Sequence, residues 1–139
     1  MNLLSMLDGN SEHLGESKAT VELFKKIEAA QPDFASSIYD LADKALIEAE
    51  EYALAKKYLG DPNARFSAAK RNFDSGIQFA KTSRHGDASR RAFESIFTDE
   101  VVRLITVLDK TGDGPLAREI QSKALVGLDS PTIRNAISK

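Results

Sequence analysis

The 139-residue chain has no cysteine, no tryptophan and only two histidines. Without cysteine, a disulfide scaffold, a cysteine-ligated zinc site and thiol chemistry are all excluded. No apolar run approaches the roughly 20 residues that a membrane span needs. The apolar residues 1–7 are too few for a secretory signal and have no basic residue before them. We therefore expect a cytoplasmic protein.

Sequence motifs of enzymes are also missing. The chain has no phosphate-binding glycine loop, no nucleophile elbow and no dinucleotide fingerprint. His85 follows Arg84 in a predicted turn without nearby carboxylates, and His13 lies on a predicted N-terminal arm, so both are expected at the surface. Carboxylates three residues apart, such as Glu48 and Glu51, lack the Glu-x-x-His motif of di-iron bundles. We expect no enzymatic activity, no catalytic residues, no metal and no cofactor.

Apolar residues recur every three or four positions along most of the chain, which is the helical period. The pattern predicts one helix from residue 16 to Pro32, then helices over 33–59, 63–83, 88–110 and 115–127, and a short last helix from Ser130-Pro131. Thr98 resembles a helix start, but the apolar register passes through it, so 88–110 is predicted as one helix. No segment has the residue pattern of a β-strand.

These elements predict an all-α protein of five to six antiparallel helices, either a helical-repeat array or an irregular bundle. We expect residues 1–15 to form a flexible arm and 16–139 a single domain. The side chains predicted to face the core of the three longest helices are Phe34, Ile38, Leu41, Ala45, Ala49, Tyr52, Ala55 and Leu59, then Phe66, Ala69, Phe73, Ile77 and Ala80, and then Ala92, Phe93, Ile96, Phe97, Val101, Leu104, Ile105 and Leu108. Tyr39, Leu46 and Ile47 widen the first of these stripes, as expected for a helix that packs on two neighbours. Gly76 either lets a crossing helix come close or marks a kink.

Gly-Asp pairs occur at residues 60–61, 86–87 and 112–113, a spacing of 26 both times. This regularity indicates either a repeating helix-and-turn unit or helices of similar length with the same turn chemistry.

Another frame matches a known repeat. Over residues 98–131 the chain resembles a degenerate tetratricopeptide repeat, with matches at Val101, Leu104, Leu108, Gly112, Ala117 and Ala124 and departures at Ile105, Gln121 and Pro131. The resemblance implies a non-catalytic scaffold that binds a peptide or another protein. Short arrays of this kind also expose apolar end faces, which a second identical chain would cover, so we consider a homodimer.

Charge is unevenly distributed along the sequence. Residues 1–55 hold 11 acidic and 4 basic side chains, whereas residues 56–91 hold 3 acidic and 9 basic ones. Either the two stretches attract each other within the fold, or the basic stretch binds a partner such as nucleic acid. The basic residues scatter around the predicted helix, and Lys70 can pair with Asp74, so a solvated rim is favoured over a nucleic-acid track.

One basic cluster stands out. Lys81, Arg84, Arg90 and Arg91 bracket a single predicted turn and form a candidate anion-binding or partner-binding corner. Tyr39, Tyr52 and Tyr58 are candidate contact aromatics, with core packing as the alternative role for each. The leading functional hypothesis is a protein-interaction module, and the alternative is a nucleic-acid-associated regulator that uses residues 56–91.

Overall fold

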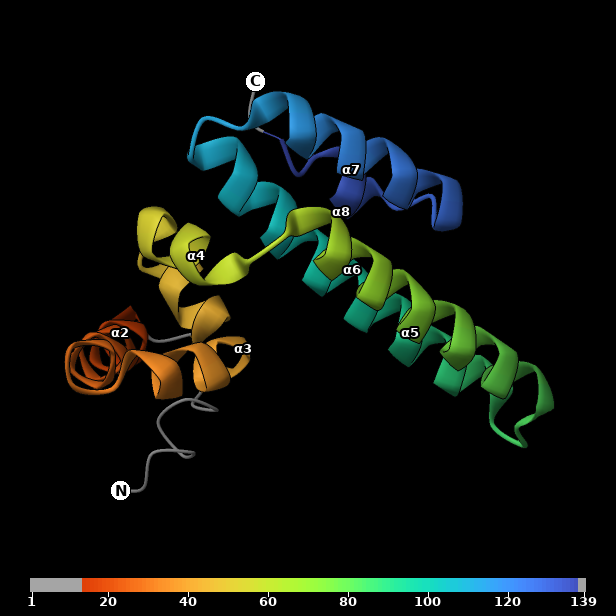
Figure 1. Ribbon diagram of the computed structural model, residues 1–139. Coiled ribbons are helices and arrows are strands. Elements are labelled where there is room, and N and C mark those ends of the chain that lie inside the picture. The colour runs from red at the N-terminus through yellow and green to blue at the C-terminus, as the bar shows by residue number, and fades with distance from the viewer. Residues whose placement is uncertain (1–13, 138–139) are drawn as a thin grey trace. The chain divides into compact units, whose positions relative to one another are not determined.

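The chain is all-α, as predicted. The computed structural model describes residues 14–137, of which 85% are helical and none forms a strand. The helices of this described part are α2 (Leu14–Ala30), α3 (Pro32–Glu48), α4 (Tyr52–Leu59), α5 (Pro62–Thr82), α6 (Gly86–Lys110), α7 (Gly114–Gly127) and α8 (Pro131–Arg134) (Figure 1). None of them is both long enough and apolar enough to cross a membrane. The predicted arm over 1–15 lies almost wholly outside the described residues.

The helices group into two compact units that meet in sequence at Leu59 and Gly60, whereas we predicted one domain over 16–139. In the first unit, α2 and α4 each pack on α3. In the second unit, α5 and α6 form a long antiparallel hairpin, and α7 and α8 pack on α6 (Figure 1). Helix α6 is continuous through Thr98, as predicted.

The predicted helix over 33–59 is wrong, because it breaks after Glu48. The N–H groups of Glu50 and Glu51 donate to the carbonyls of Ile47 and Leu46, at 3.0 and 2.8 Å. These two bonds form a Schellman motif, which ends a helix by placing one residue in the left-handed region. That residue is Glu50, with φ of 60°. Glycine usually occupies this position, so the sequence carried no stop signal here.

The core of the first unit uses only one side of the apolar stripe predicted for α3, including the predicted Tyr39 and Leu46. Ile38 and Ala45 are buried, as expected, but Phe34 and Leu41 are 43% and 47% exposed. The buried face of α3 is Ala35, Ile38, Tyr39, Ala42, Ala45 and Leu46. Since each residue advances a helix by about 100°, this face is centred about 80–100° away from Phe34 and Leu41.

In the second unit the rings of Phe73 and Phe97 stack with centroids 4.6 Å apart, and Phe66 lies 6.3 Å from Phe97. Gly76 allows a close approach of α5 to α6, the first of the two predicted alternatives, because an added Cβ would lie 2.3 Å from the ring of Phe93. The predicted burial of Ile96 is wrong: this side chain is 51% exposed, although Phe97 beside it is buried. Ala92 is also exposed.

The three Gly-Asp pairs occupy different positions in the fold. Gly60 and Gly112 each follow a helix end with a left-handed backbone, at φ of 74° and 86°. Gly86, by contrast, is the first residue of α6. The spacing of 26 residues therefore does not mark equivalent turns.

Candidate functional site

The candidate site lies at the turn between α5 and α6. After Thr82 the chain leaves the helix at Ser83, whose Oγ accepts a hydrogen bond of 3.2 Å from the backbone N–H of His85. Helix α6 begins at the next residue, Gly86, which lies against the carbonyl oxygen of Ala80. A Cβ at Gly86 would lie 2.4 Å from that oxygen, so the turn in this form requires glycine.

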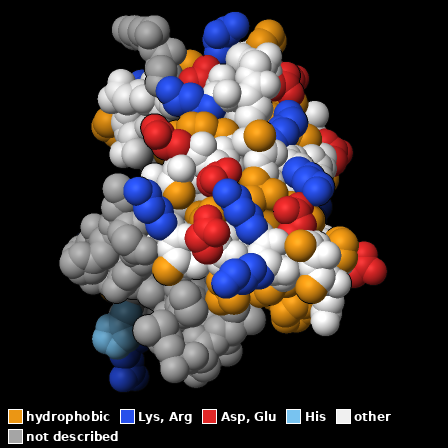
Figure 2. Space-filling view, turned by 90° about the vertical axis from the view of Figure 1, so that its left-hand side faces the viewer, with side chains coloured by type: hydrophobic (Ala, Val, Ile, Leu, Met, Phe, Trp, Pro, Cys, Tyr) orange, Lys and Arg blue, Asp and Glu red, His pale blue; other side chains and the backbone are white. Residues whose placement is uncertain are grey.

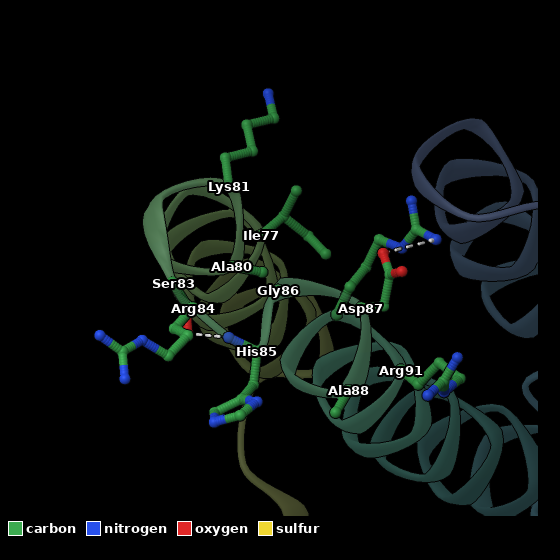
Figure 3. Close-up of a pocket in the computed structure, with 11 residues that line it drawn as sticks. Ile77, Ala80, Lys81, Ser83, Arg84, His85, Gly86, Asp87, Ala88 and Arg91 are labelled. Atoms are coloured by element: carbon green, nitrogen blue, oxygen red, sulfur yellow. Dashed lines mark hydrogen bonds and ion pairs between the residues drawn. The ribbon is translucent and has the colours of Figure 1, made fainter.

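A hollow of about 690 Å³ opens at this turn (Figure 3). Ile77, Ala80 and Ala88 contribute apolar side chains to its lining. All four basic residues predicted from the sequence also line it: Lys81, Arg84, Arg90 and Arg91. We call this feature the basic hollow.

The cations of the basic hollow diverge. Lys81 and Arg84 extend in different directions from the end of α5, and Arg91 extends from α6 (Figure 3). Arg90 pairs with Asp87 at 3.8 Å, and both side chains are largely exposed. Four basic side chains and one carboxylate thus leave an excess of positive charge. Because the cations do not converge on one point, they suit several spaced negative charges better than a single small anion.

The start of α6 adds to the positive potential of the hollow. The first backbone N–H groups of a helix carry partial positive charge and have no partner within the helix. The N-cap residue His85 makes no side-chain capping bond, and Gly86, Asp87 and Ala88 of the first turn line the hollow. The carboxylate of Asp87 offsets part of this charge.

Two other basic residues of 56–91 pair with carboxylates. Lys70 pairs with Asp74 through bonds of 2.7 and 2.9 Å, which confirms the predicted pair. Lys57 pairs with Glu28 at 2.7 Å, so one side chain of the basic stretch binds one of the acidic stretch. Figure 2 shows a different face from the one that carries the hollow, and on its described part basic and acidic side chains are interspersed.

The three candidate contact tyrosines belong to the first unit, whereas the hollow belongs to the second. Tyr39 is only 1% exposed, so it is a core residue and is not available to a partner. Its ring stacks on that of Tyr58 at 6.3 Å, and Tyr58 meets the ring of Phe24 edge-on at 5.4 Å. Tyr52, the first residue of α4, is half-buried.

Tyr58 also takes part in a charged cluster that fastens α4 to α2. The ammonium of Lys57 and the hydroxyl of Tyr58 both donate to Oε2 of Glu28, each at 2.7 Å. The hydrogen bond from Lys57 is the main cause of the lowered pKa of Glu28, and the hydrogen bond from Tyr58 is the second cause. The same bonds to Glu28 raise the pKa of Lys57 and of Tyr58. Lys57 and Tyr58 therefore make structural contacts within the first unit.

A second ion pair acts in the same unit. Lys25 of α2 donates to Glu51 at 2.8 Å, just before α4 begins. This hydrogen bond is the main cause of the raised pKa of Lys25.

The exposure of two apolar side chains of the α5–α6 hairpin was not predicted from the sequence. Phe79, one residue before Ala80 of the hollow, is 59% exposed, and Ile96 of α6 is 51% exposed. Phe79 could have been noticed, because it falls outside the predicted apolar stripe of its helix. Ile96 gave no such signal, since it continues the stripe of α6.

Among the described residues, no group of three or more His, Asp or Glu side chains is placed to hold a metal ion. His85 is exposed and lines the basic hollow, and His13 lies outside the described residues. No known protein family, curated protein or solved structure matches the chain.

Proposed function

We propose that the protein is a non-catalytic protein-interaction module that binds an acidic segment of a partner protein at the basic hollow. The observation that carries the proposal is the gathering of Lys81, Arg84, Arg90 and Arg91 around one open hollow. Spaced carboxylates along a peptide suit the divergence of these cations, and opposite charge steers such a peptide toward the hollow.

The apolar part of the lining favours a peptide over a small anion. Ile77, Ala80 and Ala88 contribute apolar side chains to the hollow. Protein interfaces combine an apolar centre with a polar and charged rim. A partner segment with both acidic and apolar residues therefore fits this end of the hairpin.

The proposal retains the tetratricopeptide resemblance as a hypothesis about the scaffold. Within 98–131, the end of α6 and the whole of α7 form a helical hairpin in which Ala117 and Ala124 are fully buried. Small residues at these positions let two helices pack closely, as the resemblance requires. Helix α6 begins 12 residues before this frame, at Gly86, so the hairpin is longer than the repeat on one side.

The alternative, a nucleic-acid-associated regulator, requires the basic residues of 56–91 to act together along a phosphate backbone. Lys57 and Lys70 already pair with Glu28 and Asp74. We therefore favour the interaction module, and the following experiment separates the two.

The test uses the full chain and a fluorescein-labelled peptide that alternates glutamate with leucine, measured by fluorescence anisotropy at low salt. Arg84→Glu combined with Arg91→Glu should weaken binding about tenfold or more, equivalent to about 1.4 kcal/mol. The matched control is Arg71→Glu, because Arg71 is an exposed basic residue of α5 that does not line the hollow. This control should change the affinity less than about twofold, a difference well under 1 kcal/mol.

Absence of peptide binding at low salt would overturn the proposal, as would equal weakening by the control variant. A mixed-sequence DNA duplex tests the alternative. Tight duplex binding that falls steeply with added salt, and that Arg71→Glu also weakens, would favour the nucleic-acid hypothesis.

A further inference from the structure

The outer face of α3 in the first unit carries apolar side chains that the core does not use. Phe34 and Leu41 are 43% and 47% exposed. They are seven residues apart, which places them on the same side of the helix, about 20° apart and about 10 Å along its axis. Ser37 lies between them and is exposed, so a neighbouring backbone can approach closely at this point.

Charges of opposite sign lie at the two ends of this face. Asp33 is exposed in the first turn of α3, and Lys44 is exposed near its end. The 11 positions between them correspond to about 16 Å along the helix axis. The ends of the face are thus acidic and basic, and the part between them carries Phe34, Leu41 and one further exposed carboxylate, Asp40, one turn before Lys44.

Such a face is complementary to itself when turned end to end. In an antiparallel pair of α3 helices related by a two-fold axis near residue 38, Phe34 of one copy lies against Leu41 of the other. The same operation brings Asp33 close to Lys44 of the other copy, and it does so twice because the contact is symmetric. A parallel arrangement would instead place like charges together.

We propose that this outer face of α3, comprising Asp33, Phe34, Ser37, Leu41 and Lys44, pairs antiparallel with the same face of a second copy of the chain. The occupant is a second copy because the antiparallel pairing sets Asp33 of each copy against Lys44 of the other, while Asp40 lies opposite the uncharged Ser36 and Ser37. Two exposed apolar side chains per copy form a small contact, so the dimer is transient and depends on concentration.

Sedimentation velocity on the full chain over a wide concentration range tests this inference. The unchanged chain should show a reversible monomer–dimer equilibrium. Lys44→Asp should shift the equilibrium toward monomer at least fivefold, because it places two carboxylates opposite each other at both ends. Asp33→Lys combined with Lys44→Asp should restore the dimer, since the charges are exchanged and remain complementary.

The matched control is Lys26→Asp, which makes the same change of charge at an exposed position of α2 and should leave the equilibrium within twofold. Leu41→Ser should abolish the dimer while circular dichroism shows the helix content unchanged. A chain that stays monomeric at all concentrations overturns the inference, as does a dimer that the double charge exchange fails to restore. A dimer that forms only after deletion of residues 1–13 also overturns it and assigns the face to that segment of the same chain.

Discussion

Replacement of Gly76 by alanine tests how α5 packs on α6. Gly76 is buried, and an added Cβ would lie 2.3 Å from both Cγ and Cδ1 of Phe93. Rotation of the Phe93 ring about χ2 does not move Cγ, because that atom lies on the rotation axis. The ring must therefore change its χ1 rotamer, or the two helices must move apart.

Two opposing effects set the size of the change. Alanine is favoured over glycine inside a helix by about 1 kcal/mol. Forcing an extra carbon into a packed contact costs about 1–3 kcal/mol. Because real Cβ atoms essentially never approach other atoms below 3.0 Å, we expect the upper part of that range. Gly76→Ala should then lower the free energy of unfolding by about 1–2 kcal/mol, and the melting temperature by at least about 4 °C for a unit of this size.

A double-mutant cycle with Phe93→Ala isolates the cause. Without the Phe93 ring, the same glycine-to-alanine change should stabilise the protein by about 1 kcal/mol, its helix-propensity value. The change of sign corresponds to a coupling energy of about 2–3 kcal/mol. The four variants are compared by urea unfolding of the full chain, followed by far-ultraviolet circular dichroism.

The control for this cycle is Ser75→Ala, an exposed neighbour on the same turn, which should change the stability by less than about 0.5 kcal/mol in both backgrounds. If Gly76→Ala has the same effect with and without the Phe93 ring, the close approach of the two helices is refuted.

Four further predictions concern helix ends and charge. Glu50→Gly should raise the free energy of unfolding by about 0.5–1 kcal/mol in thermal melts, because glycine adopts the left-handed backbone at φ of 60° without strain; an unchanged or lower melting temperature would contradict this. Asp61→Ala removes the 3.1 Å cap on the N–H of Asn63 and should cost about 1 kcal/mol in urea unfolding, whereas Asp61→Asn should retain most of the stability. Because the pKa of Glu28 is lowered in the folded state, its stabilisation is present above the unfolded pKa and is lost as the pH falls through the folded one. Acid titration of Glu28→Gln should accordingly show a shallower loss of stability than the unchanged chain. The raised pKa of Lys57 predicts the converse in alkali: its stabilisation is complete below the unfolded pKa and is lost as the pH rises through the folded one.

The candidate site could be predicted because it is local in sequence. Lys81 and Arg91 are ten residues apart across one short turn, so a helix–turn–helix connection brings their backbones together whatever the rest of the chain does. The directions of the side chains were not predictable. The divergence of Lys81, Arg84 and Arg91 depends on how α5 and α6 cross.

The predicted helix boundaries were accurate where the sequence contains clear capping residues. Asp61 caps α5 and Ser130 caps α8, and each is followed by proline, so both helices begin close to their predicted starts. The end of α3 was missed because its left-handed residue is Glu50, a residue type that normally avoids this conformation. Contacts around the break, including the pair between Lys25 and Glu51, stabilise a turn that local propensity does not favour.

The periodic spacing of apolar residues and the capping residues determined that this chain is helical and where most of its helices begin, because both effects act within a few residues. Tertiary structure alone decided which side of each helix is buried, because that depends on neighbours distant in sequence. Phe34 and Ile96 satisfy the helical period as well as Ile38 and Phe97 do, yet only the latter two meet a packing partner in the core.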